Sequence, residues 1–441
     1  MPASQPFHPV IIGSDIGIYA LVRCFYEQWG TKATCVCFAG LGPIQHSRIL
    51  DIHTLPKARE LEEKNEAIVS ELITIAPELK QKHGVDKLVL ITNSDTYIFA
   101  MNYGRERLAE HYEFLIPPED VLYATTDKTQ FASLADKFSM TTPPTVEANL
   151  DDPIDTIMQR CEGQSYPMIV KPTVSMGYEI LSWEGKHKVD TVASPDELRE
   201  LLTVLEEKTR LHPTMRRFLI QRRIEGNDTY NLSITAYADS HGKVTMMGSA
   251  HVLLEDHAPT FLGNPGAMIT EVYPDLHDQA RRFLEGVGWR GFANFDVKVD
   301  RHTNTPYFFE VNPRIGRNCY YNVAAGVNPT ELLVRDLIFH ERCELRTAKE
   351  HAYYRVLPDR LVKRYIDTHL WKQIRYLRRQ HKAVHPLLAP AEKQLSLRYL
   401  KRRLVVTRNL LNHWVKFHRY YPRKAFVEHG QQCLHTEALQ R

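Results

Sequence analysis

The residues FFEVNPR occupy positions 308–314, and the residues NFDVK occupy positions 294–298. Both stretches alternate apolar and polar side chains, as half-buried strands do, and the polar residues between them predict a hairpin. Because strand side chains alternate between two faces, Glu310 and Asn312 point the same way. Asp296 on the partner strand can join them. The hairpin therefore predicts a cluster of oxygen ligands.

Carboxylate and amide oxygens suit magnesium, which proteins hold through one or two carboxylates together with phosphate oxygens. Alone, such a short motif is equally well explained by two polar residues at the end of a strand. Two lysines favour the binding interpretation. Lys171 lies in the short apolar strand at 168–172, and Lys128 begins a helix that Asp127 caps. A lysine so placed can act as a point charge beside phosphate oxygens.

The first hundred residues alternate between strand and helix patterns. Apolar strands at 10–12, 34–39 and 87–92, with helices at 18–29 and 57–82 between them, predict a parallel, doubly wound sheet. Polar loops follow the first and third strands, at the carboxyl ends where ligands of such sheets bind. The polar residues that we select from these loops are Ser14, Asp15 and Asp95.

The amino-acid composition excludes several classes of protein. The chain has 441 residues, of which 43% are hydrophobic and 25% charged, which excludes general disorder. No apolar run approaches the roughly 20 residues of a membrane span, and the first residues do not resemble a secretory signal. Seven scattered cysteines, an odd number, predict a reducing compartment such as the cytoplasm.

The last hundred residues differ in charge from the rest. Residues 342–441 contain 23 Lys and Arg against 7 Asp and Glu, a net charge of +16, whereas residues 1–341 carry −13. Apolar residues at helical spacing predict amphipathic basic helices there. We consider three roles for this tail, in order of preference: packing on the acidic body, contact with a membrane surface or an anionic precursor, and nucleic-acid binding, which we regard as remote.

Together, the two lysines and the Asp–Glu–Asn cluster resemble the ATP-grasp superfamily. The resemblance implies a mixed α/β and α+β fold with ATP and Mg²⁺ (or Mn²⁺) as cofactors. We expect four parts, namely an N-terminal parallel α/β domain (1–122), a central lid domain (123–216), a C-terminal ATP-grasp domain with the metal site (217–345) and a basic helical extension (346–441).

The resemblance also implies roles for single residues. Asp296, Glu310 and Asn312 match the metal ligands. Lys171 matches the lysine that faces the α- and β-phosphates, and Arg314 matches the arginine beside the transferring phosphoryl group. The strand at 219–226 matches the hinge that reads adenine. The residues expected to bind nucleotide are Lys128, Lys171, Ser175, Gln221, Ile224, Glu225 and Asp228. Residues 173–177 contain one glycine where many members carry a glycine-rich phosphate loop.

A narrower resemblance is carried by Gly13-Ser14-Asp15 with Tyr19, by residues 253–256 and by residues 291–296. These are similar to the D-aspartate ligases that act on peptidoglycan precursors. That branch implies an ADP-forming ligase. In it the β-carboxylate of D-aspartate attacks the γ-phosphate of ATP, and a stem-peptide lysine amine then displaces phosphate from the acyl phosphate. Metal, lysine and arginine neutralise charge in the first step.

An acidic substrate requires cationic donors, for which we select Arg314 and Arg317. Ser14, Asp15 and Asp95 are candidates to receive an ammonium group or the acceptor. Two alternatives stay open, namely an ATP-grasp ligase that forms a different amide and an inactive nucleotide-binding scaffold at the membrane. The partners expected are the amino-acid and precursor substrates, a membrane contacted peripherally at its inner face, and further copies of the chain.

Overall fold

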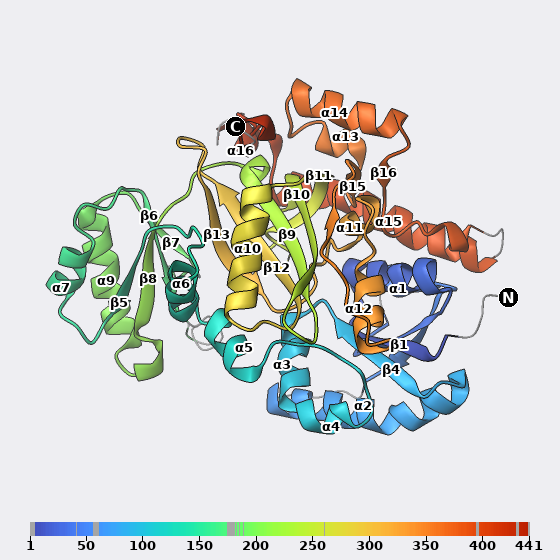
Figure 1. Cartoon of the computed structure of the whole chain (residues 1–441). Helices are drawn as coiled ribbons and strands as arrows, with labels where there is room; N and C mark the ends of the chain where they lie inside the picture. The colour runs from blue at the N-terminus through green and yellow to red at the C-terminus, as the bar shows by residue number, and fades with distance from the viewer. Residues whose placement is uncertain are drawn as a thin grey trace.

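The computed structural model describes residues 5–40, 42–55, 61–173, 181, 183–184, 186–187, 189–259, 261–393, 397–428 and 432–439. Within these residues, three β-sheets form an N-terminal domain, a lid and a central body (Figure 1). The C-terminal region packs on the body and on the N-terminal domain. No helix among the described residues is long and apolar enough to cross a membrane.

The N-terminal domain has the predicted parallel sheet, in the order β3-β2-β1-β4. The sequence pattern does not predict β3, because only Leu50 and Ile52 in that strand are apolar. Helices cover both faces, since Ile11 packs in one apolar cluster with α1 and Val10 in another with α2. The elements are β1 (Phe7–Ile12), α1 (Ile16–Trp29), β2 (Ala33–Cys37), β3 (Leu50–Thr54), α2 (Leu61–His83), β4 (Lys87–Thr92), α3 (Asp95–Tyr103) and α4 (Arg105–Ala109).

The lid is an antiparallel four-stranded sheet in the order β5-β8-β6-β7, with its own apolar core. Its strand β8 extends six residues past the boundary that we expected at residue 216. The predicted helix after Asp127 is confirmed, with Asp127 accepting hydrogen bonds from two backbone amides as its N-cap. The lid elements are β5 (Thr145–Asn149), α7 (Ile154–Arg160), β6 (Met168–Pro172), β7 (Asp190–Val192), α9 (Pro195–Thr209) and β8 (Arg217–Arg222). The two helices that precede them, α5 (Glu119–Thr126) and α6 (Lys128–Lys137), pack on the central body, because Phe131 and Ala135 of α6 share an apolar cluster with α10.

The central body is an eight-stranded sheet in the order β13-β12-β9-β10-β11-β15-β16, with β14 beside β10. The predicted hairpin is confirmed, because β12 pairs antiparallel with β13, and β9 forms a second antiparallel hairpin with β10. The elements are β9 (Asn231–Ala238), β10 (Val244–Asp256), β11 (Asn264–Thr270), α10 (Pro274–Gly286), β12 (Gly291–Val299), β13 (Pro306–Asn312), α11 (Tyr320–Ala324) and α12 (Pro329–Leu337).

The C-terminal region begins as part of this sheet. Three short strands beyond residue 345 join it, so the sheet crosses the boundary that we expected there. Helices then follow as predicted, and their apolar faces belong to the same core as α1. The elements are β14 (Arg346–Ala348), β15 (Tyr353–Arg355), α13 (Asp359–Val362), α14 (Thr368–Arg379), β16 (Ala383–Val384), α15 (Leu397–Tyr420) and α16 (Arg423–Glu428).

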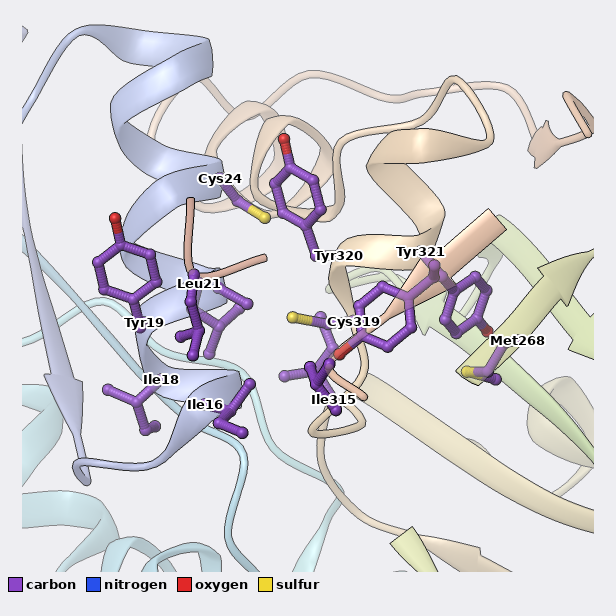
Figure 2. Packing of buried hydrophobic residues seen from close by; sticks show 14 of the residues in the cluster. Ile16, Ile18, Tyr19, Leu21, Cys24, Met268, Ile315, Cys319, Tyr320 and Tyr321 are labelled. Carbon is purple, nitrogen blue, oxygen red and sulfur yellow. The ribbon is translucent and has the colours of Figure 1, made fainter. Parts of the chain in front are cut away.

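One seam joins the N-terminal domain to the body. Figure 2 shows that α1 faces the segment Ile315–Tyr321, which follows β13, through buried apolar side chains. Gly17 lets the two backbones approach closely. A Cβ atom at Gly17 would lie 2.7 Å from the carbonyl oxygen and 2.8 Å from the Cα atom of Arg317. The position of Arg317 therefore depends on a residue without a side chain in α1.

We expect Gly17→Ala to lower the free energy of unfolding by about 1–3 kcal/mol, because the added methyl group must push the Arg317 backbone away. Thermal and urea unfolding measure this change. Gln28→Ala, at an exposed position near the end of the same helix, is the matched control and should leave stability nearly unchanged. Equal stability of the two variants would show that the seam accommodates the methyl group.

Candidate functional site

The predicted hairpin presents a polar face to the cleft between lid and body. Along β12, Phe295 and Val297 pack against the core around α10, whereas Asn294, Asp296 and Lys298 point to the other face. Across the hairpin, Asp296 pairs with Glu310 and Asn294 with Asn312. The structure therefore brings the three expected metal ligands together.

Hydrogen bonds hold this group of side chains in place. The Asn312 Nδ2 atom donates to Asp296 Oδ2 at 3.2 Å, and Asn294 Nδ2 donates to Asp296 Oδ1 at 3.4 Å. The pKa of Asp296 is raised to about 8, mainly because protein atoms surround the carboxyl group at the base of the cleft, and next because Glu310 lies close. The side chain nevertheless remains open to solvent.

These features fit a divalent cation. Two carboxylates directly opposite each other on paired strands repel, and a cation between them removes the repulsion. Among the described residues, His, Cys, Asp and Glu side chains form no group of three that could hold a metal. Two carboxylates and an amide suit Mg²⁺, which takes its remaining ligands from phosphate oxygens and water. Asp296, Glu310 and Asn312 would hold the ion.

Two lysines, one from the lid and one from the start of α6, lie near these carboxylates. Lys171 on β6 donates a hydrogen bond to Gln221 Oε1 on β8 at 3.1 Å. Its pKa is lowered to about 8, first by burial and next by the positive charge of Lys128. Lys128 lines a small hollow together with Glu310 and Asn312. Two neighbouring ammonium groups that face carboxylates across a cleft fit a nucleotide's phosphates.

The expected hinge residues are placed differently from one another. Ile224 is buried after the end of β8, as an adenine contact requires. Glu225 forms ion pairs with Arg301 at 2.9 Å and with His302, in the turn of the hairpin. The carboxylate of Asp228 binds His257 at 2.8 Å and accepts the backbone N–H of Glu255. Glu225 and Asp228 are thus engaged by protein groups, and Ser175 lies outside the described residues.

A cavity of about 490 Å³ lies where the N-terminal domain meets the body. It adjoins Asp296 and is lined by all five residues that we expected to contact the substrate. Two ion pairs cross it, between Arg317 Nε and Asp15 Oδ2 at 3.0 Å and between Arg314 Nε and Asp95 Oδ1 at 3.4 Å. Those five residues are Ser14, Asp15, Asp95, Arg314 and Arg317.

Local structure explains these positions. Asp15 is the N-cap of α1, where its Oδ1 accepts the backbone N–H of Ile18 at 2.9 Å. The amide of Asn93 also donates to this oxygen at 3.0 Å. Arg314 and Arg317 lie in the segment directly after β13. The strand that carries Glu310 therefore also positions both arginines at the cavity.

The tail reaches the wall of this cavity. Phe261 lines the cavity, and its ring lies 5.0 Å from the Arg317 guanidinium and 4.2 Å from the Lys416 ammonium of α15. Lys416 also pairs with Asp256 at 2.8 Å. A residue of the basic tail therefore supports the loop beside the cavity, which the sequence did not indicate.

Sequence reasoning missed further residues of the cleft. Ser233 and Asn318 line the cavity, and Ser233 is opposite Asp296 only through the pairing of β9 with β12. Glu255 lies near Lys298 and Asp228, and burial raises its pKa to about 8. The alternation in β12 gave a signal for Lys298, but strand pairing between distant segments gave none for Ser233 or Glu255.

Comparisons with known proteins agree with this arrangement. A family model for the carbamoyl-phosphate synthase L chain ATP-binding domain matches residues 127–328. A D-aspartate ligase of Enterococcus faecium (strain Aus0004) is 24% identical over 340 residues, which cover 77% of this chain and 78% of the relative.

Solved structures show the same fold. The biotin carboxylase domain of 2-oxoglutarate carboxylase from Hydrogenobacter thermophilus, in complex with MgADP, has a TM-score of 0.57 and 14% identity. The match covers 79% of this chain and 74% of that chain. Biotin carboxylase from Campylobacter jejuni has a TM-score of 0.53 and 15% identity, with coverage of 75% and 70%. The predicted ATP-grasp fold is confirmed, and ATP with Mg²⁺ is typical of it.

We expect Lys171 to make nucleotide affinity depend on pH. Phosphate oxygens raise the pKa of a lysine that they contact, so the contribution of Lys171 is complete below pH 8 and falls as the pH rises toward the pKa of the complex. We expect the Kd for ADP to increase by up to about tenfold per pH unit between pH 8 and pH 9.5. Titration calorimetry at fixed ionic strength measures this dependence.

The matched variant is Lys171→Arg, which keeps the positive charge at every pH in this range. It should bind ADP with a Kd that changes little between pH 8 and pH 9.5. If the variant lost affinity as steeply as the unmodified chain, another group would be responsible for the pH dependence.

Proposed function

We propose that this chain, an ATP-grasp carboxylate–amine ligase, joins the β-carboxylate of D-aspartate to the lysine side-chain amine of a peptidoglycan-precursor stem peptide. Enzymes of this class form a carbon–nitrogen bond and convert ATP to ADP and phosphate. Similarity to a D-aspartate ligase over 77% of the chain supports the choice of donor.

The charge pattern of the 490 Å³ cavity carries this proposal. D-Aspartate has two carboxylates and one ammonium group. Arg314 and Arg317 each keep further N–H donors beyond those that face Asp95 and Asp15, and these donors suit the two carboxylates. Asp15 and Asp95 offer acceptors for the ammonium group. An amino acid with a single carboxylate would leave one of the two arginines without a substrate partner.

Different residues of the cleft contribute to different parts of the activation of the substrate carboxylate. Bound MgATP supplies the phosphoryl group that converts the substrate carboxylate into an acyl phosphate. Lys171 of the lid and Lys128 at the start of α6 neutralise phosphate oxygens, while Arg314 neutralises charge where the cavity adjoins Asp296. The stem-peptide amine then attacks the acyl carbon, and phosphate leaves with the bonding electrons. The amine loses a proton, and the amide remains.

The substrates suggest where the reaction takes place. We propose that the enzyme acts in the cytoplasm and contacts the inner face of the membrane peripherally, because cell-wall precursors are anionic and some are linked to lipid. The acceptor would then reach the cavity either as a soluble nucleotide precursor or from the membrane surface.

We expect purified protein with ATP and Mg²⁺ to release ADP only when D-aspartate and a lysine-containing stem peptide are both present. L-Aspartate, D-glutamate and D-alanine, each with the same peptide, are the matched controls, and mass spectrometry of the peptide identifies the product. ADP release with another acid would keep the ligase reaction and contradict the donor. ADP release with D-aspartate but no peptide adduct would contradict the acceptor.

Glu310→Gln should weaken the binding of Mg²⁺ at least about tenfold and lower kcat strongly, because a neutral amide replaces one of the two charged ligands. Activity measured across a range of Mg²⁺ concentrations, at saturating ATP, separates the two effects. The exposed carboxylate Glu110 provides the control substitution, Glu110→Gln, which should behave as the unmodified chain does. Turnover of Glu310→Gln close to the control would show that the metal site lies elsewhere.

A further inference from the structure

Helix α15 has one face buried against the rest of the molecule. Arg402, Val406, His413 and Phe417 form this face. Arg402 pairs with Glu392 at 3.0 Å and donates to the backbone carbonyls of Pro43 and Gln45, which ties α15 to the N-terminal domain. The helix therefore has a fixed orientation, and its opposite face is turned away from the protein.

That opposite face carries a second apolar stripe. Its five large apolar residues recur at intervals of three, four and seven, which places them within an arc of about 60° at 100° per residue. Each is between 51% and 70% exposed. Exposed apolar side chains in such a continuous row mark an interaction surface. The residues of this stripe are Leu397, Leu400, Leu404, Leu411 and Val415.

Cations accompany the stripe. Lys401, Arg408 and Arg419 are exposed, and their spacing of seven and eleven residues places them along one edge of it. The sequence contains no Asp or Glu between Lys393 and Val427. The surface thus combines an apolar stripe with positive groups and carries no carboxylate. In Figure 1, α15 extends along the edge of the molecule beside α1, where a flat partner can approach it.

We propose that this face of α15 binds the surface of an anionic lipid bilayer. The leucines enter the boundary between headgroups and acyl chains, and the lysine and arginines contact lipid phosphates. A second copy of the chain fits less well. In a two-fold antiparallel pairing of the stripe, Arg408 lies near the centre and meets the Arg408 of the other copy, with no acidic residue on α15 to separate them.

The proposed contact deepens the function, because α15 also holds the wall of the substrate cavity through Lys416. Binding along the outer face of α15 places that cavity close to the membrane, where lipid-linked and other anionic precursors gather. The binding itself does not require the ligase reaction, so the two proposals fail separately.

Sedimentation of the full-length protein with sucrose-loaded vesicles tests the proposal. We expect binding to vesicles that contain about 30% phosphatidylglycerol in phosphatidylcholine, and at least about tenfold weaker binding to phosphatidylcholine alone. Raising the salt concentration to about 0.5 M should weaken the binding, because salt screens the charges. No sedimentation with anionic vesicles, or equal binding to both kinds, would overturn the proposal.

Substitutions in α15 test whether its outer face makes the contact with the vesicles. Leu404→Ser with Leu411→Ser should reduce vesicle binding at least about tenfold. The double variant should leave ADP release unchanged, because both side chains are exposed on the face of α15 opposite the one that packs on the rest of the molecule. The matched control is Lys372→Gln with Arg379→Gln on exposed positions of α14, a basic helix without such a stripe. It should bind as the unmodified chain does. Undiminished vesicle binding by the leucine variant would contradict a membrane role. The same conclusion would follow if the unmodified protein were a dimer in solution and the leucine variant a monomer with unchanged vesicle binding.

Discussion

The close approach of α1 to the segment that follows β13 is the constraint on which the substrate cavity depends. At Gly17 the helix touches the backbone of Arg317 itself, so no side chain separates the two domains there. The same contact sets Asp15, the N-cap of α1, opposite the Arg317 guanidinium. This contact therefore fixes both Asp15 and Arg317 at the wall of the cavity. The expected metal ligands lie next to it, because β13, which carries Glu310 and Asn312, leads directly into the segment that contacts α1.

In the cleft, two carboxylates lie close to each other, and so do two lysines. Asp296 and Glu310 oppose each other on the body, and the pKa of Asp296 is raised first by burial of its carboxyl group and next by the charge of Glu310. Lys171 of the lid lies near Lys128 at the start of α6, and the pKa of Lys171 is lowered first by burial and next by the positive charge of Lys128. A metal ion with a polyphosphate relieves the repulsion within both pairs at once. Loading of the cleft and approach of the lid are thus expected to be coupled through charge.

The sequence was sufficient where a local pattern decides the structure. Alternation placed Asp296, Glu310 and Asn312 on one face, and the loops after β1 and β4 delivered Asp15 and Asp95 to the cavity. It was insufficient where distant segments pair. The strand β3 is too polar to predict, and β8 joins the lid through pairs with β5 and β6 that no local pattern encodes. Glu225 and Asp228 matched the family's hinge, but the sequence could not indicate that Arg301 and His257 engage them.

The basic tail shows why net charge is a weak guide to the role of single residues. Arg402 is almost fully buried in an ion pair, and Lys416 supports the wall of the cavity, so part of the positive charge holds the fold and the site together. Lys401 and Arg408 belong to the same helix but face outward beside exposed leucines. A helix that packed on the body alone would need only its inner face to be apolar. The second stripe contributes nothing to packing on the body, and the bilayer surface that we propose would cover it and pair with the neighbouring cations.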